Sequence, residues 1–395
     1  QYFEKTAYVN FDNNARMKQV FEGDLDIERL VLSISAETGV SIEAENTLII
    51  FDEVQEVPKA LTSLKYFYEN APQYAIVAAG SFLGVALHQG TSFPVGKVDF
   101  LDLYPLNFRE FLCAMGEKQF VSMLDSCDTQ MVTVFKTKYI ERLREYYFVG
   151  GMPEVVKDFS EKKDYNRVRA IQKNLINYYQ QDFSKHAEIK LVPRLNLVWN
   201  SIPMQLAKEN KKYIYGQVRE GSRAKDFELA IQWLLDCGLI HKVQRIQKPD
   251  LPLKAYIDFD AFKLFLVDIG LLIAMTDLDA KVIIEGNKIF TEFKGALTEQ
   301  YILQQLISDV GVIPYYYSTQ NSKGEIDFLV QGKTSVIPIE VKAEENLKAK
   351  SLKAFCEKYQ PSYAVRTSMS DYREQDWMTN IPLYAIKWIE NYVNQ

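Results

Sequence analysis

Cysteine and histidine are scarce in this chain of 395 residues, and neither type is clustered. The four cysteines form no Cys-x-x-Cys pair, and the three histidines lie far apart. This spacing excludes a disulfide framework and a zinc site built from paired cysteines. Because thiols without disulfide partners suit a reducing compartment, we expect a cytoplasmic protein.

Long apolar runs and a large excess of one charge are also missing. No stretch approaches the roughly 20 apolar residues that cross a bilayer, so we expect no membrane partner. The net charge of −6 excludes a polycation that coats nucleic acid. Residues 185–250 nevertheless carry 12 Lys or Arg against 7 Asp or Glu, which indicates a nucleic-acid-facing module or, alternatively, a merely solvated surface.

The segment TLIIFDEVQEVP, residues 47–58, contains an apolar run that ends in Asp52 and Glu53. Together with AYVNF at 7–11 and YAIVAAG at 74–80, this run predicts a parallel sheet that is covered on both faces. A carboxylate at the carboxyl end of such a strand can hold hydrated Mg²⁺, and its neighbour can activate water. The alternative is a helix N-terminus that favours negative charge.

The sequence lacks GxxxxGK[ST], the loop that cradles phosphates in nucleotide hydrolases. GTSFPVGKV at 90–98 has one residue too many between its glycines, and Val98 replaces the required Ser or Thr. QGKT at 331–334 joins two predicted strands instead of leading into a helix. Because the chain starts at Gln1 without an initiator Met or a secretory signal, we expect the loop upstream of Gln1. We therefore expect this polypeptide to bind ATP poorly.

Five motifs follow one another along nearly the whole chain: TLIIFDEVQEVPKALTSLKYFYE, AAGSFLGVAL, FPVGKVDFLDLYPLNFREFL, YYFVGGMPEVV and KLFLVDIGLL. Together they resemble the AAA-like P-loop ATPases of bacteria and archaea that carry a C-terminal domain of unknown function. The resemblance implies ATP and Mg²⁺ as cofactors, with Asp52 binding magnesium, Glu53 activating water and Ser81 sensing nucleotide. Lys97 and Arg109 are candidates to supply positive charge in trans within a homo-oligomer, or are ordinary surface residues.

A second constellation lies in EIDFLVQGKTSVIPIEVK, residues 325–342, which predicts a β-hairpin. A turn centred on residues 332–333 places Asp327 diagonally opposite Glu340 on one face, which Lys342 shares. Two carboxylates and an ammonium are what a metal-dependent phosphodiesterase needs. The alternative is an amphipathic hairpin whose charged face meets solvent.

The hairpin resembles the PD-(D/E)xK restriction-endonuclease-like superfamily. Asp327, Glu340 and Lys342 match its strand motif, Glu299 matches its helical acidic position, and Glu325 is a spare candidate. The resemblance implies that Glu299, Asp327 and Glu340 bind metal and that Asp327, Glu340 and Lys342 are catalytic. It also implies nucleic acid as the partner, with DNA as the first expectation. Such folds also occur without catalysis.

We therefore predict an α/β protein of four parts. These are a P-loop NTPase sheet, truncated at its N-terminus, at 1–125, a helical lid at 126–184, a winged-helix-like segment at 185–280 and a restriction-endonuclease-like α/β domain at 281–395. The third part is predicted from a helix followed by the hairpin LIHKVQRI and PLKAYIDF. The expected function is ATP hydrolysis coupled to a nucleic-acid-binding or nucleic-acid-cleaving tail. The alternative is an ATP-dependent regulatory protein whose inactive nuclease fold binds a partner.

Overall fold

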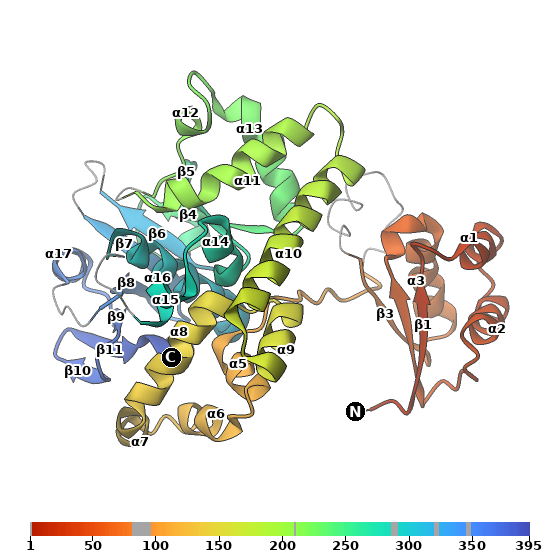
Figure 1. Ribbon diagram of the computed structural model, residues 1–395, viewed down its shortest axis with the longest axis horizontal. Coiled ribbons are helices and arrows are strands. Elements are labelled where there is room, and N and C mark those ends of the chain that lie inside the picture. Colours follow the sequence, from red (N-terminus) through yellow and green to blue (C-terminus); the bar gives the residue numbers. More distant parts are fainter. Residues whose placement is uncertain (1, 81–95, 209–210, 286–290, 320–323, 345–348) are drawn as a thin grey trace. The chain divides into compact units, whose positions relative to one another are not determined.

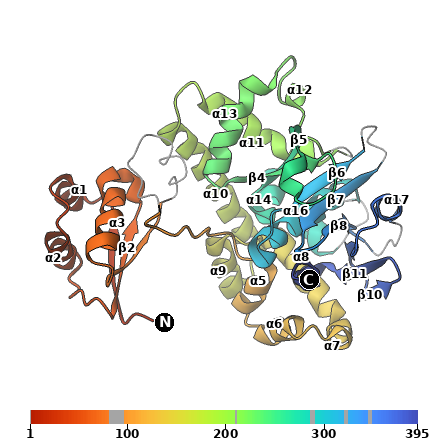
Figure 2. The ribbon, with the colours of Figure 1, turned by 180° about the vertical axis from the view of Figure 1, so that it is seen from behind.

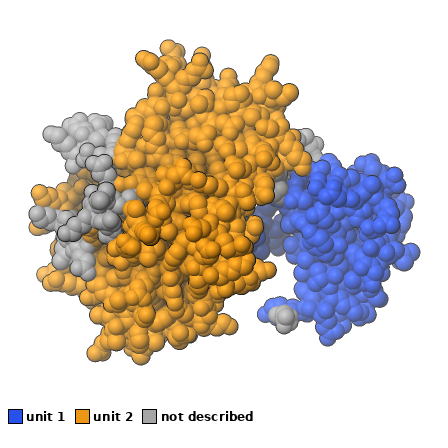
Figure 3. Space-filling model, in the orientation of Figure 1, with its two compact units in different colours: residues 1–103, 232–238 blue, residues 104–231, 239–395 orange. Residues whose placement is uncertain are grey.

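The computed structural model describes residues 2–80, 96–208, 211–285, 291–319, 324–344 and 349–395. The chain forms two compact units, which Figure 3 distinguishes by colour. Unit 1 comprises residues 1–103 and 232–238, and unit 2 comprises residues 104–231 and 239–395. Among the described residues, no helix combines the length and the apolar character that a membrane crossing requires.

Unit 1 contains a parallel sheet with strand order β1–β2–β3 and three helices (Figure 1). Pro58 occupies the first turn of its third helix, where the lack of an N–H costs no hydrogen bond, and Asn14 and Asp26 cap the first two by accepting backbone N–H groups. The elements are β1 (Lys5–Asn10), α1 (Ala15–Glu22), α2 (Ile27–Thr38), β2 (Thr47–Asp52), the 3₁₀ turn η1 (Val54–Glu56), α3 (Pro58–Asn70) and β3 (Ala75–Ala78).

The sheet of unit 1 has one buried face among the described residues, so the prediction of two covered faces is wrong. Ala7 and Val9 of β1 are buried in one hydrophobic core with Ile49 and Phe51 of β2, whereas Tyr8 is 52% exposed. The same core contains apolar residues of α1, α2 and α3, so all three helices pack on one side. Burial therefore alternates along the strands, although their composition is apolar throughout.

Helices follow residue 103 along the chain; the sequence predicts them up to about residue 184 and again from Phe227, but not the two helices between these segments. The first helix of the series begins with the predicted capping box, in which Asn107 and Glu110 each accept the other's backbone N–H. They are α5 (Phe108–Ala114), α6 (Lys118–Asp125), α7 (Thr129–Val134), α8 (Lys136–Val149), α9 (Pro153–Lys162), α10 (Tyr165–His186), α11 (Val192–Leu206), α12 (Tyr215–Val218) and α13 (Ala224–Asp236).

The rest of unit 2 is built around a mixed eight-stranded sheet with the order β10–β11–β9–β8–β7–β6–β4–β5 (Figure 2). Its strands are β4 (Ile240–Ile246), β5 (Ile257–Leu266), β6 (Tyr315–Ser318), β7 (Glu325–Gln331), β8 (Val336–Val341), β9 (Val365–Ser368), β10 (Arg373–Gln375) and β11 (Met378–Pro382). The accompanying helical elements are η2 (Leu253–Tyr256), α14 (Ile269–Met275), α15 (Ala280–Ile284), α16 (Thr291–Gln305), the π-helix η4 (Leu306–Val310), α17 (Lys350–Tyr359), η5 (Leu383–Ile389) and α18 (Glu390–Val393).

The hairpin of β4 and β5 belongs to this large sheet, because β4 pairs in parallel with β6. Its second strand starts at Ile257, later than predicted, since Leu253–Tyr256 form a 3₁₀ turn. The predicted boundary at residue 280 thus falls inside one compact unit. The winged-helix-like and nuclease-like domains stay predictions.

Asp268 is fully buried at the start of α14 and is bonded to three segments of unit 2. Its Oδ1 accepts the N–H of Leu271 at 3.0 Å, and its Oδ2 accepts the N–H of Gly151 at 2.6 Å. Gln304 of α16 donates its Nε2 to the same Oδ2 at 3.3 Å and to the hydroxyl of Tyr146 at 2.9 Å. These five residues form the Asp268 network, in which both carboxylate oxygens have uncharged donors.

Glycines allow the backbone to approach this network. Gly150 has a φ of +74°, and a Cβ added there would lie 2.2 Å from Oδ1 of Asp268. A Cβ on Gly151 would lie 2.1 Å from the carbonyl oxygen of Leu106, and one on Gly270 would lie 2.5 Å from another backbone oxygen. The motifs YYFVGGMPEVV and KLFLVDIGLL therefore meet at a contact that has no space for a side chain.

Candidate functional sites

The Asp52 carboxylate lies at the carboxyl end of β2, level with Asn10 of the neighbouring strand β1. Its Oδ2 accepts hydrogen bonds from the Tyr8 hydroxyl and from Asn10 Nδ2 at 3.2 Å, and its Oδ1 accepts the N–H of Glu53 at 3.0 Å. The bond to Asp52 raises the pKa of Tyr8, which keeps the phenol a donor. Sequence reasoning missed Tyr8 and Asn10, although their i, i+2 spacing puts both on one side of the adjacent strand.

Glu53 follows Asp52 in a left-handed backbone conformation, with φ 50° and ψ 42°. This conformation costs a non-glycine residue about 1–3 kcal/mol, and such strain concentrates at active sites. Its carboxylate accepts a hydrogen bond from Gln55, and the chain then returns towards β3 through a 3.0 Å bond from Val54 N to Ala79 O. Asp52 and Glu53 are thus adjacent at the sheet edge with oxygen ligands of the kind that hydrated Mg²⁺ takes.

Three further residues were predicted for the nucleotide site: Ser81, Lys97 and Arg109. Ser81 lies outside the described residues. Nζ of Lys97 lies 3.4 Å from the Glu69 carboxylate and 4.9 Å from the centre of the Tyr68 ring, so its charge is engaged by α3. Arg109 is on α5 in the other compact unit. Their roles towards a phosphate stay predictions.

Arg109 connects three elements of unit 2. Its Nη1 lies 3.0 Å from Asp309 in the π-helix η4, and its Nη2 pairs with Asp125 of α6. Burial raises the pKa of Asp309, and the positive charge of Arg109 opposes that increase. In this conformation the arginine is part of the packing of α5 against its neighbours.

In the C-terminal hairpin, Asp327 and Glu340 lie directly opposite each other in the strand register, whereas the sequence predicted a diagonal placement. Phe328 lies opposite Ile339 and Val330 opposite Ile337, so Asp327 and Glu340 are the next pair along the ladder. The diagonal placement is therefore wrong. The connection spans residues 332–335 instead of two residues, and a shift by two positions keeps every side chain on its predicted face.

Seven charged side chains meet around this pair, and we call them the carboxylate–lysine cluster. Its members are Glu299 of α16, Glu325 and Asp327 of β7, Glu340 of β8, Lys342, Lys263 of β5, and Lys211 from the segment between α11 and α12. Lys342 Nζ lies 2.5 Å from Glu340 Oε1, and Asp327 Oδ2 accepts the N–H of Val341 at 2.7 Å. Glu299 pairs with Lys211, and Lys263 pairs with Glu325.

Burial and mutual repulsion set the charge state of the carboxylates in the cluster. Burial raises the pKa of Asp327 well above its usual range, and the charges of Glu299 and Glu340 raise it further. Burial also raises the pKa of Glu340, against the opposing effect of Lys342. Burial acts in the same direction on Glu299, but Lys211 and Lys263 outweigh it, and the pKa of Glu299 is lowered.

Lys211 and Lys263 were missed by the sequence reasoning. Lys263 is fully buried within the otherwise apolar run AFKLFLV, and this isolated lysine in a strand is the signal that could have revealed it. For Lys211, 88 residues from Glu299, the sequence offers no comparable signal. Among the described residues, no three His, Cys, Asp or Glu side chains are grouped so that they could hold a metal ion.

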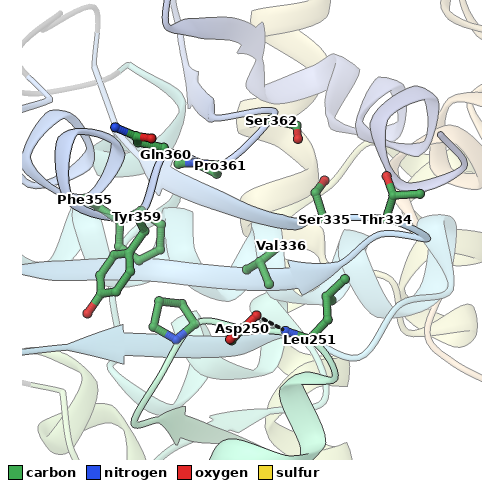
Figure 4. Close-up of a pocket in the computed structure, with 11 residues that line it drawn as sticks. Asp250, Leu251, Thr334, Ser335, Val336, Phe355, Tyr359, Gln360, Pro361 and Ser362 are labelled. Carbon is green, nitrogen blue, oxygen red and sulfur yellow. Dashed lines mark hydrogen bonds between the residues drawn. The ribbon is translucent and has the colours of Figure 1, made fainter.

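A pocket of about 230 Å³ lies elsewhere in unit 2 (Figure 4). Its walls come from the segment before η2, the β7–β8 connection and the end of α17, and they include Asp250, Ser335, Phe355 and Tyr359. Asp250 is paired with Lys248 at 2.7 Å. None of the lining residues belongs to the carboxylate–lysine cluster.

Comparison with known families divides the chain into three matched segments. Residues 1–112 match an AAA domain. Residues 140–282 match a domain of unknown function (DUF8612), and residues 294–386 match another domain of unknown function (DUF4143). Neither the curated proteins nor the solved structures give a match. The first match supports the resemblance to AAA-like ATPases, whereas none of the three supports a winged helix or a nuclease.

Proposed function

We propose that unit 1 binds and hydrolyses ATP with Asp52 and Glu53 as the central residues. The observation that supports this proposal most directly is the position of the Asp52 carboxylate at the carboxyl edge of a parallel sheet, where Tyr8 and Asn10 orient it by hydrogen bonds. This part of the chain lies within the segment that matches an AAA domain. Mg²⁺ bound there would neutralise charge on the phosphates. Asp52 would hold the hydrated ion, and Glu53, fixed by its left-handed backbone, would orient the attacking water.

The test uses the full-length protein, with any residues that precede Gln1 included. Glu53→Gln should lower the rate of ATP hydrolysis by about 10²–10⁴-fold while ATP binding persists. Asp52→Asn should weaken both Mg²⁺-dependent binding and hydrolysis. Glu56→Gln, whose carboxylate lies 3.7 Å from Lys18, is the matched control and should resemble the wild type. Hydrolysis by Glu53→Gln at the wild-type rate would remove the assignment.

We propose as a second function that unit 2 acts on nucleic acid through the carboxylate–lysine cluster. The supporting observation is the convergence of Asp327, Glu340 and Lys342, with Oε2 of Glu340 buried and lacking a hydrogen-bond partner among the described residues. A divalent ion bound there would polarise a phosphodiester. Asp327 and Glu340 would hold that ion, and the ammonium of Lys342 would orient water and offset developing charge.

Cleavage and simple binding are distinguished by one comparison. Wild-type protein and Glu340→Gln are incubated with duplex DNA, single-stranded DNA and RNA in Mg²⁺ or Mn²⁺, with and without ATP. Cleavage by the wild type that Glu340→Gln abolishes supports the phosphodiesterase function. If every substrate stays intact but is bound in a salt-dependent way, unit 2 is a non-cleaving binding module. If nucleic acid is neither cut nor bound, the alternative of a protein-binding regulator is favoured.

A further inference from the structure

Two lysines of the carboxylate–lysine cluster come from outside the segment that supplies its carboxylates. Lys211 and Lys263 lie within residues 140–282, the first domain of unknown function. Glu299, Glu325, Asp327 and Glu340 lie within residues 294–386, the second. The cluster is therefore composite, since one matched segment provides counter-ions to carboxylates of the other.

The two lysines differ in how firmly they are held. Lys263 has a fully buried side chain, pairs with Glu325, lies 3.7 Å from Oε2 of Glu299 and is 4.8 Å from the centre of the Tyr316 ring. Lys211 is 13% exposed, comes from a connection between two helices, and pairs with Oε1 of Glu299. Lys263 is thus a fully buried counter-ion within a strand, whereas Lys211 is a slightly more exposed counter-ion from the connection between two helices.

The charge balance of the cluster depends on Lys211. Counted with all four carboxylates ionised, as binding of a cation would require, three ammonium groups face four carboxylates, and withdrawal of Lys211 leaves an excess of two negative charges. Oε2 of Glu340 is buried and has no hydrogen-bond partner in the described part of the chain. Such an oxygen is costly unless a donor or a cation reaches it during function.

We propose that Lys211 is an internal counter-ion that keeps divalent cations out of this cluster, so that Mg²⁺ or Mn²⁺ enters only when Lys211 withdraws from Glu299. The Lys211 ammonium pairs with Oε1 of Glu299, whereas Oε2 of Glu299 is buried and has no hydrogen-bond partner among the described residues. Lys263 would stay in place in both states. This inference rests on the second proposed function, because that function gives the cation its role. The experiment measures cation binding and not cleavage.

The experiment measures Mn²⁺ binding to the full chain by electron paramagnetic resonance and calorimetry. Lys211→Met should bind Mn²⁺ about 10- to 100-fold more tightly than the wild type. The gain should disappear when Glu340→Gln or Glu299→Gln is added to Lys211→Met. Lys212→Met is the matched control, because the charge of Lys212 interacts with Asp258, which is not a member of the cluster. This variant should bind Mn²⁺ as the wild type does.

Two further variants protect the test against a folding failure. Lys211→Gln keeps a donor for Glu299 while removing the charge, and it should also gain Mn²⁺ binding. Lys211→Arg keeps the positive charge, so its cluster should bind Mn²⁺ as weakly as that of the wild type. The inference is overturned if the wild type already binds Mn²⁺ at the cluster as tightly as Lys211→Met, or if no folded variant without the charge at 211 binds Mn²⁺ there. Loss or absence of DNA cleavage bears on the second proposed function and leaves this result unchanged.

Discussion

Asp268 and Glu340 are both buried carboxylates of unit 2, but their surroundings differ in kind. Asp268 accepts hydrogen bonds at both oxygens, all from uncharged donors. Burial raises the pKa of both carboxyls, but Glu340 has Lys342 on one oxygen and no hydrogen-bond partner on the other among the described residues, and neighbouring carboxylates raise its pKa further. The first arrangement satisfies a buried charge and joins elements, whereas the second leaves a charge incompletely satisfied, as sites of chemistry do.

The largest effect is expected from Gly151→Ala beside Asp268. Its Cβ would lie 2.1 Å from a backbone oxygen, so the backbone must move and the hydrogen bond from Gly151 N to Asp268 is lost. We expect a loss of more than about 4 kcal/mol in the free energy of unfolding, because a backbone clash is combined with the loss of a buried hydrogen bond. Urea denaturation followed by tryptophan fluorescence measures it, since Trp199 and Trp388 are buried in unit 2.

Gly295→Ala is the matched control for that variant. A Cβ at Gly295, inside α16, would meet no atom within 4 Å. Because alanine is the better helix former, this variant should be more stable than the wild type by about 0.5–1 kcal/mol. If Gly151→Ala and Gly295→Ala lost the same free energy of unfolding, the close packing beside Asp268 would not be especially sensitive to an added side chain.

A smaller but still large effect is expected from Asp268→Ala. Removal of the carboxylate leaves the N–H groups of Gly151 and Leu271 and the amide of Gln304 without their acceptor, at about 1–3 kcal/mol for each donor that stays unsatisfied. We expect a total loss of about 4 kcal/mol after partial relaxation. Asp279→Ala, which removes an exposed helix cap, should cost only about 1 kcal/mol.

The smallest effect, with the opposite sign, is expected from Glu340→Gln. Because burial raises the pKa of Glu340 above its ordinary 4.5, its contribution to stability is present below pH 4.5 and is lost as the pH rises through the folded-state pKa. The neutral amide removes this loss. At pH 7 we expect Glu340→Gln to equal or exceed the wild type by about 1 kcal/mol in the free energy of unfolding.

The comparison is made by denaturation of both proteins from pH 4 to pH 8. The wild type should lose stability relative to Glu340→Gln as the pH increases across this range. A wild type that gains relative stability with increasing pH would show that Lys342 satisfies Glu340 fully. The contrast with Asp268 would then disappear.

Local patterns identified most elements of both units. The apolar run 47–51 and Pro58 predicted β2 and α3, and Asn107 with Glu110 predicted the start of α5, because each signal acts within a few residues. It was harder to predict which faces of a sheet are buried. The three helices of unit 1 pack on one side of its sheet, and this arrangement depends on packing and not on the composition of the strands. The hairpin register also failed, because a four-residue connection gives the same side-chain faces as the predicted two-residue turn.

Contacts between distant segments could not be predicted at all. Lys211 meets Glu299 across 88 residues, and Gly151 meets Asp268 across 117 residues. Sequence reasoning found four members of the cluster as catalytic or metal-binding candidates, with Glu325 as a spare, because they fit a strand and helix pattern. Their counter-ions lie on other elements, so only the three-dimensional structure shows that the cluster is partly neutralised.

Trp388 donates its indole N–H to the carbonyl oxygen of Leu124 at 2.7 Å, across 264 residues. The N–H of Phe108, in the first turn of α5, is likewise accepted by Gln305. A ribosome must therefore deliver most of unit 2 before α5 and α6 obtain their partners. Such long-range closure slows folding and leaves these two helices without their partners while the chain is being synthesised.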